Sequence, residues 1–238
     1  MKALKSIFSG IIILLILSIT ISCDAKVAKS KSSETVTLKL GSYSKIQFDG
    51  GYEVVLIQGD EESITIEANK DIIGSIKTSI ENNKLHVYYD KDVQHNKILV
   101  TLKFKNIDEL EINGAASLKC HQSLNLTSLK LHVAGGATIT LPVNIENIEL
   151  VLDGGTNVDL TGKAVKANFK LNGAGKIDAE NLLAENLKVE IAGAGYARVN
   201  ASKEINAIVS GVGAIEYSGN PAKVKSEVNG IGSVKEKD

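Results

Sequence analysis

Tryptophan is absent from this chain of 238 residues, and cysteine and arginine are almost absent. The only thiols are those of Cys23 and Cys120. If Cys23 carries lipid, no disulfide can close within the chain, and the fold has to rest on its packed core. Aromatic residues make up 4% of the chain, which argues against a module that stacks rings on sugars. The single arginine, Arg198, argues against a polysaccharide lyase, because such enzymes need a clustered Arg or Lys base.

The chain also lacks a basic surplus and the usual catalytic spacings. Without Lys2 and Lys5, 25 basic residues face 28 acidic ones, a net charge of −3, so we expect no nucleic-acid partner. The four histidines are His86, His95, His121 and His132. None is spaced as H-x-x-x-H or H-x-x-E-H, and no G-x-S-x-G motif occurs. We therefore expect solvated strand histidines, a buried and inert Cys120, no cofactor and no enzymatic activity.

The N-terminal segment has the order of a secretory signal peptide. A basic start is followed by a nearly unbroken apolar run at 11–21, and a small residue then precedes Cys23. This arrangement resembles a lipobox, although a lipobox usually has Leu where Thr20 stands. The alternative is a single-pass membrane anchor, but the run is short for a spanning helix of about 20 residues. We predict that 1–22 are a signal peptide, and that 23–34 comprise a lipidated Cys23 and a flexible polar tether.

A glycine-centred motif recurs through the C-terminal half. Its copies run from INGAASLKC (112–120) to VNGIGSVKE (228–236), and LNGAGKIDA (171–179) is a representative one. The first glycines of the copies are Gly114, Gly135, Gly154, Gly173, Gly193, Gly211 and Gly230. They are separated by steps of 18 to 21 residues, a regularity that indicates a repeat architecture. FDGGYEVVL (48–56) resembles an earlier, more diverged copy.

Each copy follows a run with apolar residues at every second place, as in LKLHV (129–133). This is the period of a strand with one buried face. A propeller blade needs roughly 40 residues, and a leucine-rich repeat needs a helical or 3₁₀ return that the strand-like second half does not provide. A dinucleotide fingerprint is excluded because no helix follows the glycines. We therefore predict an all-β fold, a right-handed parallel β-helix-like solenoid with coils of about 18–21 residues.

We expect residues 35–238 to form a single β-solenoid domain. The seven regular repeats occupy 112–236. Residues 35–111 are less regular and are predicted to form wider coils that cap the N-terminal end, since an open end is a pairing edge. Asn82 and Asn83 form a candidate turn within them. The charged tail at 235–238 is expected to blunt the other end.

Stacked copies place equivalent residues in columns. The first glycines are predicted to face inward at a bend, where a large side chain would collide with neighbouring coils and where Gly admits positive φ. The next position forms a flat, outward strip of small residues: Ala115, Gly136, Gly155, Ala174, Ala194, Val212 and Ile231. Such a strip suits contact with a protein or a polymer, but a tight corner that binds nothing is the simpler interpretation.

One outward column holds the acidic residues that are candidates for chemistry. Asp159 and Asp178 would stack about 4.8 Å apart at the backbone. Two adjacent carboxylates can bind a cation or shift each other's pKa. Arg198 follows in the next coil, and the column then alternates in sign. We therefore expect a charge ladder that supports the stack, with Asp159 and Asp178 as the alternative metal candidates.

The combination of leader, Cys23, YEVVLIQG (52–59), NNKLHV (82–87) and serial NGAG-type coils resembles one family over 36–236. It is the Putative auto-transporter adhesin, head GIN domain family. The resemblance implies an all-β repeat fold in envelope lipoproteins of Gram-negative bacteria, and it supplies no catalytic motif.

Together these features lead us to expect a non-enzymatic lipoprotein, exported and lipid-anchored in the cell envelope through Cys23. The expected site is the outer membrane, on its periplasmic or surface face. The expected role is that of an adhesin or scaffold, with a protein or polysaccharide ligand. The alternative is a carbohydrate-active or carbohydrate-binding β-helix protein that uses Asp159, Asp178 and Arg198.

Overall fold

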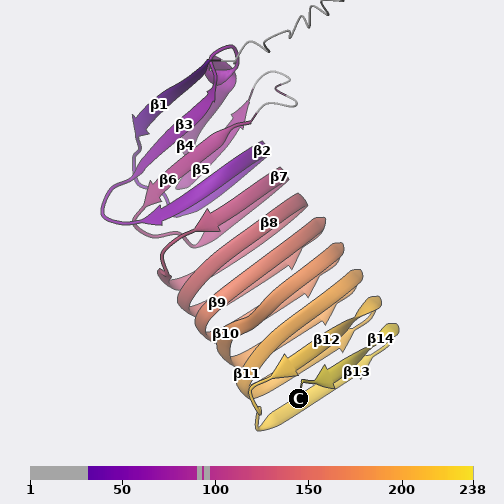
Figure 1. Ribbon diagram of the computed structural model, residues 1–238. Coiled ribbons are helices and arrows are strands. Elements are labelled where there is room, and N and C mark those ends of the chain that lie inside the picture. The colour runs from indigo at the N-terminus through magenta and orange to yellow at the C-terminus, as the bar shows by residue number, and fades with distance from the viewer. Residues whose placement is uncertain (1–31, 90–92, 94–96, 238) are drawn as a thin grey trace, which may run out of the picture. The chain divides into compact units, whose positions relative to one another are not determined.

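Alternating apolar residues build strands whose buried face lines the inside of a coil. The computed structural model describes residues 32–89, 93 and 97–237. These residues form a β-solenoid of about 7 turns (Figure 1). The predicted all-β solenoid is therefore confirmed. No helix among the residues described is long and apolar enough to cross a membrane.

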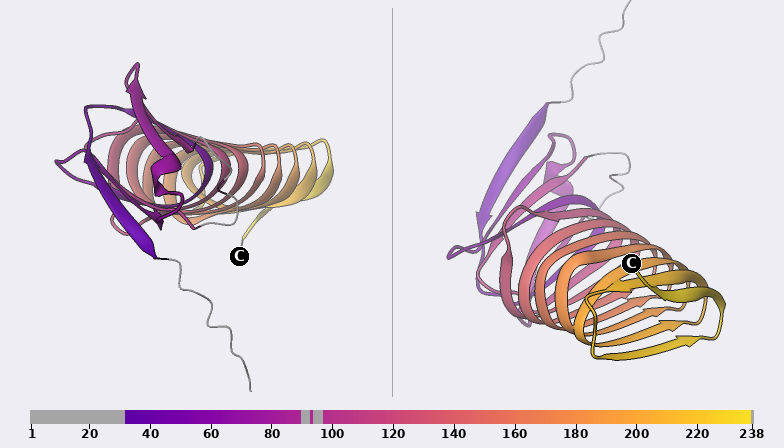
Figure 2. Two further views of the ribbon diagram at one scale, coloured as in Figure 1. Left: turned by 90° about the horizontal axis from the view of Figure 1, so that it is seen from above. Right: turned by 60° about the horizontal axis from the view of Figure 1, so that its bottom comes forward.

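The long central strands each continue around a bend, so that one element supplies both sides of a coil (Figure 2). One short 3₁₀ helix, η1, spans Ile73–Ser75. The strands are β1 (Ser33–Lys39), β2 (Lys45–Gln58), β3 (Ser63–Asn69), β4 (Ile76–Glu81), β5 (Lys84–Tyr89), β6 (Leu99–Phe104), β7 (Glu109–Cys120), β8 (Leu124–Leu152), β9 (Gly155–Leu171), β10 (Ala174–Ile191), β11 (Ala194–Val209), β12 (Val212–Ser218), β13 (Lys223–Val228) and β14 (Ile231–Glu236).

Successive coils pair in parallel, with the repeats in register. Gly114 of β7 pairs with Gly135 of β8, as the repeat alignment predicts. Gly50 of β2 pairs with Gly114, so the segment 48–56 is indeed an earlier copy of the motif. The regular stack therefore begins at β2, one coil before the first regular repeat.

The core is a set of aliphatic columns inside the coils. One column is continuous in the ladder from β2 to β12, and each of its members is at most 3% exposed: Val54, Leu118, Ile139, Val158, Ile177, Ala197 and Ile215. Each buried Val, Leu or Ile side chain contributes about 1.5–3 kcal/mol relative to an exposed one. These columns stabilise the fold without a disulfide among the described residues, where Cys120 is a free thiol.

The first-glycine column lies at the bend. The reason why glycine is required there is more specific than the expected crowding by side chains. A Cβ on Gly154 would lie 1.7 Å from the carbonyl oxygen of Gly135, and one on Gly173 would lie 2.0 Å from that of Gly154. The clash is with the backbone of the preceding coil, not with side chains inside the coil. Among the seven predicted glycines, only Gly114 and Gly135 have φ in the left-handed region, at 138° and 151°. Close approach between coils therefore selects glycine along most of the column.

The N-terminal region differs from the expected wider coils. Two separate segments pair with β2 on the side away from β7. β5 pairs with Lys45–Phe48 of β2, and β6 pairs with Glu53–Gln58 of β2. β4 runs antiparallel to β5. The predicted turn joins these two strands, with φ of 50° at Asn82 and 65° at Asn83. This tight turn reverses the chain, and a hairpin therefore stands where a further coil was expected.

Two more antiparallel strands cover this end. β3 pairs with β6, and β1 pairs with the far side of β3. The N-terminal end of the stack is thus capped, as expected, but by a mixed sheet. At the other end, β13 pairs with β11 and β14 pairs with β12. Of the predicted charged tail, Lys235 and Glu236 belong to β14 itself and Lys237 reaches back to Glu180, so these described residues do not cover this end.

Candidate functional site: a groove over the small-residue strip

The predicted outward strip is a continuous column on the surface. Ladder pairs join its members from Ala115 to Ile231, and all of them are exposed. Gly51 pairs with Ala115 and extends the strip by one coil into β2. The outward orientation inferred from the repeats is therefore confirmed.

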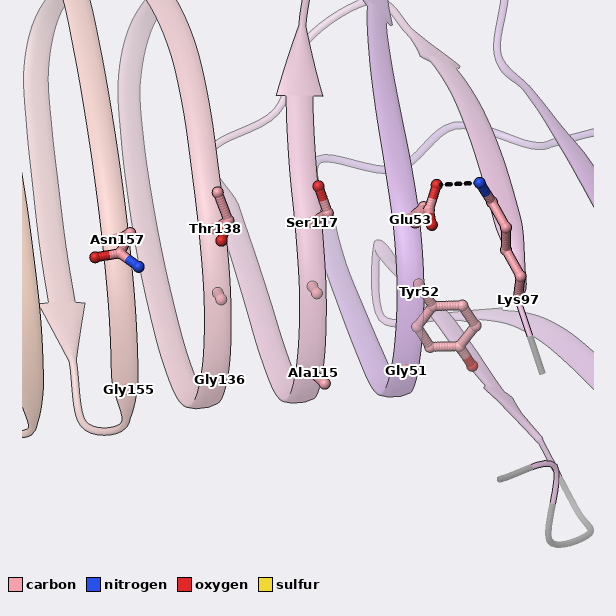
Figure 3. Close-up of a pocket in the computed structure, with 12 residues that line it drawn as sticks. Gly51, Tyr52, Glu53, Lys97, Ala115, Ser117, Gly136, Thr138, Gly155 and Asn157 are labelled. Atoms are coloured by element: carbon pink, nitrogen blue, oxygen red, sulfur yellow. Dashed lines mark ion pairs between the residues drawn. The ribbon is translucent and has the colours of Figure 1, made fainter. Parts of the chain in front are cut away.

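The N-terminal part of the strip is the floor of a shallow groove with a volume of about 480 Å³ (Figure 3). Its floor consists of Gly51, Ala115, Gly136 and Gly155. A row of polar residues, successive partners in the ladder, follows one side: Glu53, Ser117, Thr138 and Asn157. The groove therefore runs across coils, with one polar side chain from each.

Packing does not require glycine on the groove floor. A Cβ on Gly155 would meet no atom within 4 Å, and one on Gly136 would lie 3.9 Å from the carbonyl oxygen of Gly155. Neither residue has φ in the left-handed region. The neighbouring Gly154 differs sharply, because a Cβ there would collide with the preceding coil. Glycine at 136 and 155 leaves the floor without side chains. Steric crowding at the bend does not explain the choice of glycine at these two positions.

The polar row offers neutral hydrogen-bonding groups to the groove. Ser117, Thr138 and Asn157 make no side-chain hydrogen bond with another residue in the described part of the chain. Their hydroxyl and amide groups can both donate and accept hydrogen bonds. A ligand that lies in the groove can therefore be bound through these three side chains.

The side chains at the N-terminal end of the groove already have partners within the chain. Lys97 Nζ lies 2.9 Å from Glu53 Oε2, so the two charges at this end are paired. Tyr52 is only 4% exposed, and its hydroxyl donates to the carbonyl of Asp49 at 3.2 Å. Burial raises the pKa of Tyr52. Its ring packs against Phe48 and is not available to stack on a sugar.

The predicted acidic candidates are neighbours, as expected, but only one of them has charged partners. Asp178 pairs with Asp159 in the ladder. The Asp178 carboxylate accepts hydrogen bonds from Arg198 and from Lys176. Burial by itself would raise the pKa of Asp178, but these bonds outweigh it and hold the pKa below its ordinary value. This arrangement favours the charge ladder, and no group of His, Cys, Asp and Glu in the described ranges is placed to hold a metal ion.

A histidine, an aspartate and an asparagine form a cluster that sequence spacing missed. His86 Nε2 lies 2.5 Å from Asp49 Oδ2, and Asn113 donates to Asp49 Oδ1 at 2.9 Å. Gln47 donates to both carboxylate oxygens at 3.0 Å. Burial would raise the pKa of Asp49, but the bonds from Gln47, Asn113 and His86 lower it overall.

The same arrangement recurs further along the stack. His132 Nε2 lies 2.7 Å from Asp153 Oδ2, and hydrogen bonds from Asn172 and His132 lower the pKa of Asp153. His86 and His132 are partly exposed strand histidines, but each also contacts an aspartate, which the expectation of solvated strand histidines did not include. The sequence did contain a signal, because an aspartate such as Asp153 stands directly before the first glycine of a repeat. In the neighbouring coil, a histidine stands two residues before the position that lies beside this aspartate.

The other sequence candidates are inert or outside the described residues. His121 is exposed. Cys120 is buried as expected, and burial raises the pKa of its thiol. Cys23 and His95 lie outside the residues described, so the lipidation of Cys23 stays a prediction.

Comparisons with known proteins agree with this fold. Residues 42–221 match the family described as Putative auto-transporter adhesin, head GIN domain. No curated protein matches the chain significantly. A putative adhesin from Bacteroides fragilis superposes with a TM-score of 0.75 at 23% identity, covering 87% of this chain and 98% of that one.

Two structures from Parabacteroides are similar in the same way. A putative adhesin from Parabacteroides merdae has a TM-score of 0.63 at 20% identity, with 88% of this chain and 98% of that one covered. A putative lipid binding protein from Parabacteroides distasonis has a TM-score of 0.66 at 19% identity, with the same coverages of 88% and 98%. At these identities the structural likeness shows the fold alone. The family match spans most of the sequence, and the chain therefore belongs to the Putative auto-transporter adhesin, head GIN domain family.

Proposed function

We propose that this protein is a non-enzymatic adhesin of the cell envelope whose groove binds a linear, uncharged glycan. The observation that carries the proposal is the groove floor, where Gly136 and Gly155 are not required by packing and leave the surface bare beside a row of neutral polar groups. Membership of an adhesin family supports a surface or envelope role. The scarcity of nucleophiles and metal ligands near the groove supports binding without catalysis.

The spacing of the groove suits a polymer that lies along the solenoid. Neighbouring strands are about 4.8 Å apart, so Ser117, Thr138 and Asn157 offer one hydrogen-bonding group per coil. Sugar hydroxyls both donate and accept, as these three side chains do. Each such hydrogen bond adds about 0.5–1.5 kcal/mol. We therefore expect weak binding at a single groove and firm attachment only when many grooves act together.

A peptide ligand is less well served by the same surface. Peptides commonly bind by adding a strand to a free sheet edge or by placing apolar side chains in pockets. The groove lies on the face of the stack, where the backbone groups of the coils are already paired in the ladder. Its small-residue floor offers no side-chain pocket. A glycan with repeated hydroxyl groups fits these features better.

The location follows from the N-terminal segment and belongs to the same proposal. The basic start, the apolar run and Cys23 support export and a lipid anchor in the outer membrane. Ser33 and Glu34, which the sequence assigned to the tether, belong to β1, and the polar segment before them would give the domain freedom to reach a ligand. Whether the domain faces the periplasm or the exterior is tested by protease treatment of intact cells, and digestion is expected if it is an adhesin.

The groove is tested by filling its floor. Gly155→Leu places a large side chain among the polar groups without a backbone clash, so binding should fall strongly and the melting temperature should hold. Ala134→Leu is the matched control, because Ala134 is exposed on the other side of the bend and lies outside the groove. Binding of the full chain and both variants is measured on an array of neutral polysaccharides and oligosaccharides.

The polar row is tested in the same assay. Thr138→Ala and Asn157→Ala should each weaken binding by about two- to tenfold, the loss of one hydrogen bond. Absence of binding to every neutral glycan, or equal binding by Gly155→Leu and the unmodified chain, would contradict the proposal. Shortening of a bound glycan during incubation would contradict its non-enzymatic part and favour the carbohydrate-active alternative.

A further inference from the structure

The C-terminal end of the stack is an open strand edge. In the described chain through Lys237, nothing pairs with the far sides of β13 and β14. Every residue of β13 is exposed, including Val224 at 44% and Val228 at 43%. Figure 1 shows these two strands as the last layer of the stack, whereas the opposite end is covered by β1, β3 and the β4–β5 hairpin. An uncovered edge with exposed apolar residues is a site for pairing with another strand.

The exposed valines stand where the core would continue. Val224 pairs with Ile205, and Val228 pairs with Val209, and both partners in the preceding coil are fully buried. Ser226 lies between the two valines on the same inward face. Within the described chain the inward column therefore ends at this coil, where its residues are exposed.

Half of the backbone amide and carbonyl groups along this edge also lack a strand partner in the described chain. The amides of Asn229, Ile231 and Lys237 donate to the preceding coil. In a parallel ladder the alternate residues direct their amide and carbonyl groups to the opposite edge. The backbone groups of Val224, Ser226 and Val228 therefore face the open side, where a second strand can pair with them.

We propose that this edge pairs antiparallel with the same edge of a second copy of the chain, about a two-fold axis through Ser226. In that register Val224 of one copy lies opposite Val228 of the other, on the inward face. Lys225 lies opposite Glu227 of the second copy, on the outward face, and the axis repeats both pairs. Opposite charges directly across an antiparallel pair stabilise it. The edge is thus complementary to itself, as a two-fold interface requires.

Charge selects this register over its neighbours. A shift of the axis to Lys225 would place Lys225 opposite its own copy, and a shift to Glu227 would do the same for Glu227. Like charges directly opposite each other destabilise the pair. Only the axis through Ser226 keeps valine opposite valine and lysine opposite glutamate.

The second strand of the edge fits the same axis. Ser226 and Ser233 are equally far along the chain from the bend at Asn229 and Gly230, so one axis can pass through both sides of the flattened coil (Figure 2). Across β14, Gly232 then lies opposite Val234 of the second copy, a small residue against a larger one. The aliphatic stem of Lys235 lies opposite Ile231, which is 76% exposed in a single chain.

Two charge reversals test the pairing. Lys225→Glu and Glu227→Lys each place like charges opposite each other in a pair of identical copies, so each variant alone should be monomeric at concentrations where the unmodified chain is a dimer. A mixture of the two variants restores opposite charges at both positions and should form a mixed dimer. Molar mass is measured by light scattering and analytical ultracentrifugation of the full chain over a concentration series.

The control lies two coils away in the same outward column. Lys188→Glu changes the same charge on β10, far from the edge, and should leave the dimer unchanged. Lys225→Glu loses its ion pair with Glu204, but Lys223 still contacts Glu204 at 2.9 Å, and the melting temperature should therefore change little. A monomeric unmodified chain, a dimer that survives either single reversal, or a mixture that stays monomeric would each overturn the proposal.

Discussion

Several charged side chains on the outer surface have partners in the adjacent coil. Asp178 is bound by Arg198, and Lys203 Nζ lies 2.6 Å from Glu185 Oε2 in the same manner. Each pair joins positions about one coil apart in the chain. Exposed pairs of this kind contribute about 0.2–1 kcal/mol each. The surface charges therefore help align neighbouring coils, while burial of the apolar columns provides most of the stability.

Asp178 gives this interaction a defined dependence on pH. Its folded pKa is below the ordinary value of 3.8, so the ionised carboxylate stabilises the fold. The contribution is fully present above about 3.8, the unfolded pKa, and is lost as the pH falls through the lower folded pKa. Asp178→Asn should therefore lower the free energy of unfolding by about 0.5–1 kcal/mol at pH 7, and the difference should close in acid.

This is measured by urea unfolding of both proteins from pH 7 to pH 3. Asp159→Asn is the matched control, because Asp159 is exposed and makes no ion pair with any described residue. A difference for Asp178→Asn that is the same at pH 3 and pH 7 would contradict the assignment of its stabilising effect to the charged pair.

Two neighbouring columns of small residues differ in how closely they let adjacent coils approach each other. The first-glycine column lets the backbone of one coil approach the carbonyl groups of the preceding coil. The next column faces outward and makes no such approach. Adjacent residues of the same type, Gly154 and Gly155, therefore have opposite structural requirements.

A single methyl group tests this contrast. Gly154→Ala would place a Cβ 1.7 Å from the carbonyl oxygen of Gly135, so the coils must move apart. We expect a loss of about 1–3 kcal/mol or more in the free energy of unfolding. Gly155→Ala meets no atom within 4 Å and should be neutral or stabilising by about 0.4–1 kcal/mol, because alanine restricts the unfolded chain.

Both variants are compared with the unmodified chain by chemical denaturation, with circular dichroism as the probe of strand content. Equal stability of Gly154→Ala and Gly155→Ala would show that close approach of the backbone does not select glycine in this column.

The complete molecule combines three parts with separate roles. The leader and Cys23 are proposed to fix the protein on a membrane, the groove near β2 to bind a glycan, and the C-terminal edge to join two copies. A pair of copies would carry two grooves at opposite ends of a doubled stack. Two linked sites increase the strength of attachment even when each site binds weakly.

The membrane anchor is tested at Cys23. Cys23→Ala should abolish incorporation of labelled palmitate and leave an unprocessed or released protein, because the thiol that would accept the lipid is gone. Cys120→Ala is the control and should retain the label, since Cys120 lies inside the coil. Unchanged labelling of Cys23→Ala would show that this protein is not a lipoprotein of the expected kind.

Local sequence patterns were sufficient for the coil and its repeat. Period-2 alternation shows which side chains face inward, and the spacing of the glycines shows where the chain bends. Because each regular coil stacks on its neighbour in sequence, the columns of Gly173 and Ala174 follow from alignment of the repeats alone. The β-solenoid was predicted on this basis and is confirmed. The family resemblance, which also rested on the leader, Cys23 and the motifs at 52–59 and 82–87, is confirmed by the family match.

Tertiary structure decided the features that depend on contacts between distant segments. The alternation in 35–111 shows a buried face but not the direction of the neighbouring strand, so the β4–β5 hairpin and the antiparallel pairs of β3 with β6 and β1 were missed. The pairing of His86 with Asp49 and of Lys97 with Glu53 joins residues that no repeat aligns. The groove has a defined end only because β6 lies beside β2. A periodic pattern shows which face of a strand is buried. Which strands pair with it, when they are far apart in the sequence, depends on the packing of the whole chain.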